Sequence, residues 1–142
     1  AMIDSIVKEC SSNNLELPTL RLESGRGIAQ GTAVTLGRVG VVKEWPGHKK
    51  WANLDVSTNH IMRIITSHWY HHIIAANKES LKNLETYDVV GPLCIPDELG
   101  LDRKLPLLER GDLLAILDTG AYAEPTASNF NAQPRPATVL VS

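Results

Sequence analysis

The chain has 142 residues, enough for one domain with a buried core, and it is 43% hydrophobic and 21% charged with a formal net charge of -2. Basic residues are neither in excess nor clustered, which argues against a nucleic-acid partner, and no apolar run approaches the roughly 20 residues of a membrane span. The start of the chain lacks the pattern of a secretory signal, and two cysteines are too few for a disulfide scaffold, so the composition predicts a reduced, cytoplasmic protein with no membrane partner.

The first residues have the spacing of a helix, and the next ones have that of a strand. Apolar side chains in residues 2–10 recur at helical intervals, and the polar run 11–14 ends this predicted helix. Pro18 breaks any helix after it, so we expect a short strand at 19–22. A helix followed by a strand is typical of the end of a separate α/β domain.

The middle of the chain is rich in β-forming residues. Glycines between residues 25 and 40 interrupt them, which indicates bent strands. We expect a strand pair over 34–45, a turn at 46–50 and a returning strand at 51–56. Residues 59–76 fit both the helical and the strand period in part, and the β-branched residues near their two ends favour extended structure there.

Further short strands are expected in the second half. Residues 87–94 and 113–122 have the composition of buried strands, and residues 137–142 predict a last strand. The polar residues 77–85 and the proline-containing residues 95–112 predict loops. Many short strands separated by glycine and proline predict a mainly β fold, a sandwich or a barrel.

The histidines suggest a metal site at first sight. His68, His71 and His72 would share one face of a helix, and His60 lies eight residues before them. A zinc site needs three or four ligands with supporting partners, and no thiol or carboxylate close in sequence completes this set. We therefore interpret the histidines as structural or interface residues and predict no metal site.

Other candidates remain open when only the residues are considered. The glycine spacing of residues 25–31 matches no phosphate loop, so glycines at bent strands are the preferred interpretation. Glu23 and Arg26 lie at the end of the first predicted strand, where they can face a ligand or form a surface ion pair. Cys94 follows a strand end, and a lone cysteine is more often a small core residue than a catalytic one.

Four motifs taken together resemble one family. Residues 23–26 (Glu-Ser-Gly-Arg) resemble its Glu-Pro-Gly-Arg motif, and residues 91–94 (Gly-Pro-Leu-Cys) resemble its Gly-Pro-x-Cys motif. Gly-Asp at 111–112 and Gly-Ala-Tyr at 120–122 resemble its last signature. In order and spacing the chain resembles the C-terminal part of the pyridoxal-phosphate-dependent diaminopimelate, ornithine and arginine decarboxylases, and the diaminopimelate branch is the most similar.

This resemblance implies a fold-type III decarboxylase with a (β/α)8 barrel followed by a C-terminal β domain. Residues 1–26 would be the last helix and strand of the barrel, and residues 27–142 would be the β domain. The family's Schiff-base lysine, cofactor-stacking histidine and glycine phosphate loop all lie upstream of these residues. We therefore expect a fragment that is inactive alone.

The resemblance also implies roles for individual residues toward pyridoxal 5'-phosphate. The cofactor ring is an electron sink for the carbanion left by carbon dioxide. Glu23 matches the carboxylate at the ring nitrogen, while Gly25, Arg26 and Tyr122 match other cofactor-binding positions. Arg26 and Tyr122, together with Arg63, also match positions that bind the amino-acid substrate.

Cys94 matches a cysteine that reaches the active site from a neighbouring subunit. A thiol there can return a proton to the substrate's Cα if the site shifts its pKa. The active sites would then be shared in a homodimer. A non-catalytic β module that kept the fold and acts as a binding or regulatory partner is the alternative function.

Two substrate positions depart from the diaminopimelate pattern. Ser67 stands where the family has a tyrosine, and Ile95 stands where it has a glutamate that holds the substrate's distal ammonium. An isoleucine cannot hold that charge, and leaving a buried charge unpaired costs several kcal/mol. Asp97 and Glu98 are the nearest carboxylates that can replace the glutamate.

Overall fold

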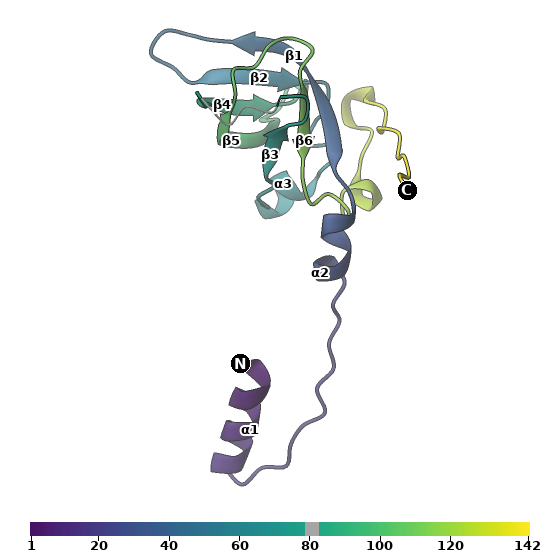
Figure 1. Cartoon of the computed structure of the whole chain (residues 1–142). Helices are drawn as coiled ribbons and strands as arrows, with labels where there is room; N and C mark the ends of the chain where they lie inside the picture. The colour runs from purple at the N-terminus through teal and green to yellow at the C-terminus, as the bar shows by residue number, and fades with distance from the viewer. Residues whose placement is uncertain (79–82) are drawn as a thin grey trace.

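The structure, a computed structural model, describes residues 1–78 and 83–142. In this part of the chain six strands form one sheet, in the order β3-β6-β1-β2-β4-β5. The sheet curls until its two edge strands, β3 and β5, contact each other, which makes it nearly a closed barrel (Figure 1). The prediction of a mainly β fold is confirmed. The strands are β1 (Thr35–Lys43), β2 (Lys50–Leu54), β3 (Ile73–Ala75), β4 (Glu85–Val90), β5 (Glu98–Leu105) and β6 (Leu113–Ile116).

Two of the strand pairs, β1–β2 and β4–β5, join strands that are consecutive in sequence, and the other pairs join distant ones. β1 pairs antiparallel with β2 on one side and with β6 on the other, and β3–β6 and β4–β5 are also antiparallel. β2 and β4 are parallel, so the chain between them must cross over the barrel. The core inside the curled sheet is built from the inward side chains of these strands, including Val39, Leu54, Ile73, Tyr87, Val89, Leu99, Leu105, Leu114 and Ile116.

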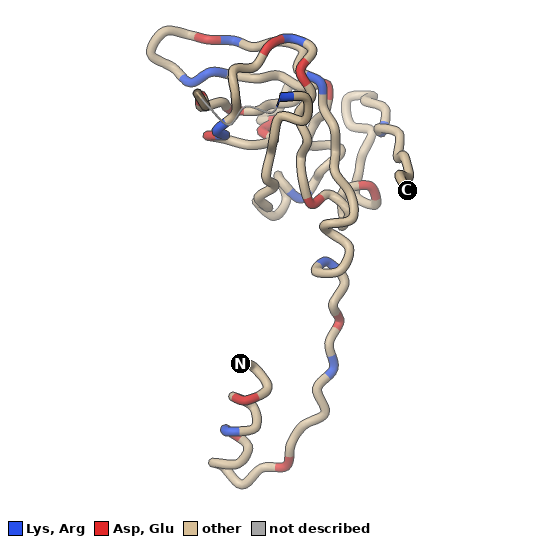
Figure 2. Tube along the Cα trace, in the orientation of Figure 1, with Lys and Arg blue, Asp and Glu red and all other residues tan. Residues whose placement is uncertain are grey.

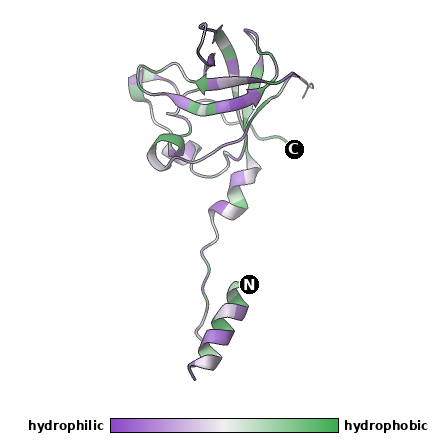
Figure 3. Cartoon of the chain, turned by 90° about the vertical axis from the view of Figure 1, so that its left-hand side faces the viewer, coloured by the Kyte–Doolittle hydropathy of each residue, from purple (hydrophilic) through white to green (hydrophobic). Residues whose placement is uncertain are grey.

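Among the described residues there are also three helices and three 3-10 turns, and the first helix lies away from the sheet (Figure 1). α1 (Met2–Ser12) matches the predicted helix, and its apolar side chains alternate with polar ones (Figure 3). α2 (Arg26–Ala29) and α3 (Arg63–Ser67) lie at one end of the sheet. The 3-10 turns are Gln30–Thr32, Glu124–Thr126 and Phe130–Ala132. No helix in the described ranges is long and apolar enough to cross a membrane.

An extended segment, residues 13–25, connects α1 to the sheet (Figure 1). The strand predicted at 19–22 is wrong, because this stretch pairs with no other strand among the described residues, and a strand needs a neighbour. Leu17, Leu20 and Leu22 are exposed along it. Charged residues of both signs are interspersed over the rest of the chain (Figure 2).

Local β propensity misled the prediction at two helical segments. Residues 64–66 were expected to be extended, but they lie in α3, where Ile64 packs against the core beside the buried Ile61. This partial burial of Ile64 accompanies a helix in spite of the preference of β-branched residues for strands. Gly27 and Gly31 lie in α2 and the 3-10 turn after it, so the bent strand expected at 25–31 is also wrong.

Three further boundaries differ from the prediction. Residues 98–105 were expected in a loop but form β5, with the prolines only flanking the strand, and Leu99 and Leu105 buried. β6 ends at Ile116 rather than at residue 122. Residues 137–142, which the structure describes, are exposed and form no strand. Part of the loop expected at 77–85 lies outside the described residues.

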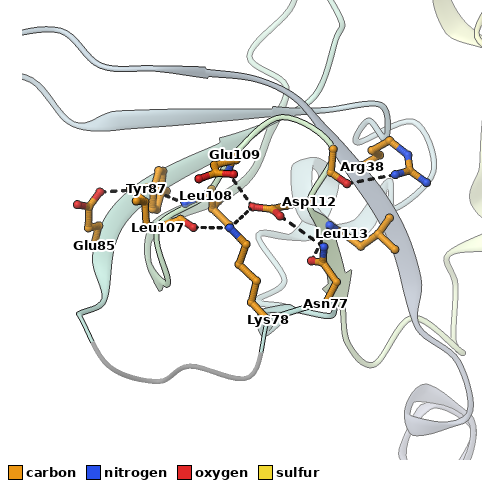
Figure 4. Close-up of polar contacts among 11 residues, drawn as sticks. Arg38, Asn77, Lys78, Glu85, Tyr87, Leu107, Leu108, Glu109, Asp112 and Leu113 are labelled. Carbon is orange, nitrogen blue, oxygen red and sulfur yellow. Dashed lines mark hydrogen bonds and ion pairs between the residues drawn. The ribbon is translucent and has the colours of Figure 1, made fainter.

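A buried carboxylate fastens the turn before β6 (Figure 4). Oδ2 of Asp112 accepts hydrogen bonds from the backbone N–H of Glu109 and from Nζ of Lys78, both at 2.7 Å. Lys78 Nζ also donates to the carbonyl of Leu107, and Asn77 Nδ2 lies 3.4 Å from Asp112 Oδ1. Desolvation raises the pKa of Asp112, but the bonds from Lys78 and Glu109 outweigh it and hold that pKa below its ordinary value.

We expect Asp112→Asn to lower the free energy of unfolding at pH 7 by roughly 1.5–3 kcal/mol, the range for a hydrogen bond to a charged group. Because the folded-state pKa lies below the ordinary value of 3.8, this contribution is present above about pH 4 and is lost as the pH falls through the folded-state pKa. Denaturation curves of both proteins should therefore converge in acid.

Asp102→Asn is the matched control. The Asp102 carboxylate is 64% exposed and forms an ion pair with Lys49 at 2.7 Å, so its loss should change the free energy of unfolding by less than about 1 kcal/mol. Equal losses in the two variants would contradict the role assigned to Asp112.

Candidate functional site

Four side chains from distant parts of the sequence meet beside α2 and α3. The Cζ atom of Arg26 lies 4.0 Å from the centre of the Trp69 ring, and Trp69 meets the edge of the Tyr122 ring with centroids 5.6 Å apart. Arg63 completes the group, with its Cζ atom 4.9 Å from the Tyr122 ring and 5.6 Å from the Trp69 ring. We call these four residues the arginine–aromatic cluster.

Gly120 brings α2 to Tyr122. Its backbone N–H donates to the carbonyl of Gln30 at 2.9 Å, and the N–H of Thr119 donates to the carbonyl of Ala33 at 3.0 Å. A Cβ atom on Gly120 would lie 2.1 Å from the carbonyl oxygen of Ala29, a distance that real structures do not allow. Only glycine permits this close approach, which holds the end of α2 against the turn before Tyr122.

Tyr122 occupies a backbone conformation that aromatic residues rarely adopt. Its φ is +62°, in the left-handed region, which costs an L-residue on the order of 1–2 kcal/mol. The hydroxyl of Thr126 donates to the Tyr122 carbonyl and holds this turn. The ring stays 43% exposed, so the strained turn presents it at the surface rather than burying it in the core.

The two guanidinium groups of the cluster have no carboxylate partner in the part of the chain that the structure describes. Arg26 Nε donates to Gln30 Oε1 at 2.8 Å, and Arg63 Nη1 donates to Ser67 Oγ at 3.2 Å. Arg63 Nε is buried and lacks a hydrogen-bond acceptor among the described residues. Two cations beside one indole ring, one of them with an unused buried donor, are suited to an anionic ligand such as a carboxylate or a phosphate.

Glu23 and Gly25 are near Arg26 in sequence but are not part of this cluster. Both residues are exposed in the extended segment, where the Gly25 N–H donates to the Glu23 carbonyl at 3.1 Å. The ion pair between Glu23 and Arg26 that the sequence left open is not formed among the described residues, since Arg26 bonds to Gln30 instead. The structure therefore brings together Arg26, Arg63 and Tyr122 of the predicted residues, but not Glu23.

Cys94 lies in a second, separate arrangement. It is exposed on the loop between β4 and β5, and Asn131 Nδ2 lies 3.3 Å from its sulfur. Asn59 holds the segment that carries Asn131, because it donates to the Phe130 carbonyl at 2.8 Å and accepts from the Ser128 N–H at 3.0 Å. Asn59, in the turn after β2, thus holds the C-terminal segment in a position where Asn131 contacts the Cys94 thiol.

The sheet domain can be matched to known proteins. A family model described as the pyridoxal-dependent decarboxylase, C-terminal sheet domain, matches residues 29–120, more than half of the chain. The chain belongs to this decarboxylase family. All six strands lie within the matched residues, so the family assignment rests on the β domain itself.

Individual decarboxylases are similar over most of the chain. Diaminopimelate decarboxylase of Archaeoglobus fulgidus is 44% identical over 126 residues, which cover 88% of this chain and 30% of that protein. The crystal structure of diaminopimelate decarboxylase from Methanocaldococcus jannaschii matches with a TM-score of 0.77 and 39% identity, over 94% of this chain and 30% of that one. The chain thus spans about 30% of the length of the relatives it matches.

One motif of the decarboxylase family has a structural explanation at the Cys94 loop. Asp97 is buried, and its Oδ1 accepts bonds from the N–H and the hydroxyl of Thr58 at 2.7 and 2.6 Å. Its Oδ2 accepts from the N–H of Leu93 at 3.0 Å. A Cβ atom on Gly91 would lie 2.1 Å from that oxygen, so the motif's glycine makes room for the carboxylate that holds the loop.

The same contacts decide between the two carboxylates next to Ile95. Both oxygens of Asp97 are used inside the fold, so Asp97 does not replace the missing glutamate. Glu98 is exposed instead and lines a surface groove of about 440 Å³. Trp69 and Arg103 line the groove as well.

The histidines have separate partners. His60 Nε2 lies 3.1 Å from the carbonyl of Pro134, and His71 Nδ1 lies 2.9 Å from that of Leu117. His72 Nδ1 lies 3.2 Å from the hydroxyl of Tyr70. Among the residues in the described ranges, no three histidine, cysteine, aspartate or glutamate side chains gather as metal ligands.

The sequence analysis missed Trp69. Trp69 lies in residues 59–76, which fit the helical and the strand period only in part. The pattern therefore did not show which side of the segment Trp69 occupies. One feature of the sequence could have pointed to it: Trp69 is an aromatic residue only two positions after Ser67, where the resemblance expects a tyrosine.

We expect Gly120→Ala to separate α2 from the turn before Tyr122. Overpacking of this kind lowers the free energy of unfolding by roughly 1–3 kcal/mol, and movement of Arg26 away from Trp69 should change the tryptophan emission spectrum. Gly27→Ala is the control, because its Cβ atom meets nothing within 4 Å and alanine favours a helix. A Gly120→Ala protein with wild-type stability and emission would refute the close-packing argument.

Proposed function

We propose that the chain forms the C-terminal part of a pyridoxal-phosphate-dependent decarboxylase acting on an amino acid of the diaminopimelate type. The observation that carries the proposal is the convergence of Arg26, Arg63 and Tyr122. The motif resemblance assigns all three to the cofactor and substrate, and they come from separate elements, α2, α3 and the turn after β6. Three residues that the motifs assign to one site lie together, and the two arginines among them have no carboxylate partner in the described residues, which supports a shared role in binding an anion.

The residues present fit the anionic parts of the cofactor and the substrate. Arg26 and Tyr122 would hold the phosphate and a substrate carboxylate, and the buried unpartnered Nε of Arg63 would complete the anion site. When bound, the cofactor supplies an electron sink for the electrons released with carbon dioxide. The protein's own task here is to orient the leaving carboxylate and to keep its charge among fixed donors.

Glu23 and Cys94 would enter the site from outside the arginine–aromatic cluster. Glu23 would keep the ring nitrogen protonated, with Gly25 allowing the backbone to approach the cofactor. Residues 1–26 would belong to the barrel domain and residues 27–142 to the β domain. The exposed apolar side chains of α1, including Ile3 and Val7, support packing against such a barrel.

Cys94 would serve the active site of a second copy of the protein. Its exposure on a loop tied down by Asp97 supports this role, because a thiol held at the surface can reach across a subunit boundary. The enzyme would then be a cytoplasmic homodimer with shared active sites. The Cys94 thiol would donate a proton to the substrate's Cα after carbon dioxide has left.

The substrate's far end is where this protein would differ from its diaminopimelate-specific relatives. Ile95 offers no charge for the distal ammonium, and Asp97 is used within the fold. Glu98 in the groove beside Trp69 is the carboxylate that remains for that ammonium.

Turnover of diaminopimelate by the holoenzyme tests the proposed function. We expect Arg26→Ala to lower kcat/KM by about a hundredfold, which corresponds to about 2.8 kcal/mol. Tyr122→Phe should weaken cofactor binding by roughly ten- to a hundredfold, since a hydroxyl–phosphate bond contributes roughly 1.5–3 kcal/mol.

Arg110→Ala is the control for a lost surface arginine, because Arg110 is exposed and lies outside the cluster. Its kcat/KM should stay within twofold of the wild type. If Arg26→Ala behaves like Arg110→Ala, or if the wild-type holoenzyme releases no carbon dioxide from any diamino acid, the proposed function fails and a non-catalytic module is favoured.

A mixing experiment tests the shared active site. Homodimers of Cys94→Ala and of Tyr122→Phe carrying Arg26→Ala should both be nearly inactive. After subunit exchange, one of the two sites in each heterodimer would have a complete set of residues, so up to a quarter of wild-type activity should return. Subunit exchange would be verified by mass spectrometry. If exchange occurs and no activity returns, Cys94 acts in the active site of its own subunit or takes no part in the reaction.

A further inference from the structure

Trp69 reaches the cluster because of the way α3 ends. The helix stops at Ser67, and His68 adopts φ +51°, the left-handed conformation that closes helices. The N–H of Trp69 then donates back to the carbonyl of Arg63 at 3.2 Å. This tight turn brings the residue after the helix back over the first residue of the helix, so Trp69 lies beside Arg63.

Trp69 contacts every other member of the arginine–aromatic cluster. Arg26 stacks on its face at 4.0 Å, Tyr122 meets its ring at an interplanar angle of 81°, and Arg63 lies 5.6 Å from its centre. Arg63 and Tyr122 also contact each other, whereas Arg26 joins the cluster through the Trp69 ring. The indole is therefore the group that links α2 to the rest of the site.

Positions 67 and 69 face the same guanidinium. Ser67 Oγ accepts a hydrogen bond from Arg63 Nη1 at 3.2 Å, and the Trp69 ring lies against the same side chain. The tyrosine that the motif resemblance expects at position 67 would therefore also lie next to Arg63. A serine there leaves space, and the aromatic group comes from two residues further along the chain.

We propose that Trp69 is a positioning residue that replaces the missing tyrosine by aiming Arg26 and Arg63 at a bound carboxylate. Trp69 also lines the groove that contains Glu98, so it forms a wall between the anion site and that groove. The indole face attracts both cations and keeps them together despite their mutual repulsion. This inference rests on the proposed function and adds a residue that sets substrate affinity in this chain.

Decarboxylation kinetics of the holoenzyme with diaminopimelate test the proposal. Trp69→Ala should raise KM by about tenfold or more, with kcat changed less, because the arginines lose their orientation rather than the reacting groups. Trp69→Phe should retain most of the affinity. The decisive variant is Trp69→Ala combined with Ser67→Tyr, which should return KM to within about threefold of the wild type.

Two outcomes would overturn the proposal. One is an unchanged KM in Trp69→Ala. The other is a folded Trp69→Ala, Ser67→Tyr double variant that stays as weak as Trp69→Ala, which would give Trp69 a packing role only. Trp45→Ala removes a tryptophan that is 73% exposed at the β1–β2 turn and should leave both kinetic constants unchanged.

A second measurement separates this inference from the proposed function. With Trp45→Phe and Trp51→Phe, Trp69 is the sole tryptophan of the chain, and its emission reports on the cluster directly. Titration with diaminopimelate, and separately with inorganic phosphate, should change the emission saturably, and Arg63→Ala should abolish the change. If the holoenzyme has no activity, the proposed function fails and this titration decides the role of Trp69: a saturable response supports it, and no response overturns it.

Discussion

The proposed site depends on one close contact, that of Gly120 with the backbone of residues 29–33. Without a side chain at Gly120, the carbonyl of Ala29 can lie where a Cβ atom would otherwise be, and two backbone hydrogen bonds fix that distance. α2 then lies against the turn before Tyr122, and Arg26 stacks on the Trp69 ring, which in turn contacts Tyr122. This contact determines where α2 lies relative to the barrel.

Gly91, the glycine of a second motif, also allows a close contact because it has no side chain, here at the loop between β4 and β5. Gly91 leaves room for the Asp97 carboxylate, which ties the Cys94 loop to Thr58. The family motifs therefore contain two kinds of residue. Arg26, Tyr122 and Cys94 are exposed side chains, whereas Gly91 and Gly120 allow the close contacts that keep their surroundings in place. Motif matching alone does not separate the two kinds, because both recur at fixed spacing.

The sequence predicted the β class, the strand pair around the first turn, and three of the cluster residues. The β class and the strand pair are confirmed, while for Arg26, Arg63 and Tyr122 the structure shows that they lie together and their roles stay predictions. β5 was missed because prolines 96 and 106 bound it closely and obscured the alternating Leu99 and Leu105. α3 was missed because its helical form depends on burial of one face, which no local preference records. Trp69 could not be assigned to the site, since its place depends on the left-handed turn at His68.

The parallel pairing of β2 with β4 has a consequence for how the site forms. The connection between these strands carries the Asn59 turn, α3, Trp69 and β3, so two of the four cluster residues, Arg63 and Trp69, lie on one crossover segment. Both ends of that segment are fixed only when two strands distant in sequence have paired, and such non-local pairing is slow because the loop must be closed first. The arginine–aromatic cluster should therefore be among the last parts to become ordered during folding. Arg63 and Trp69 are thus placed by the crossover connection and Tyr122 by the turn after β6, so the position of the cluster depends on sheet pairing as well as on its own contacts.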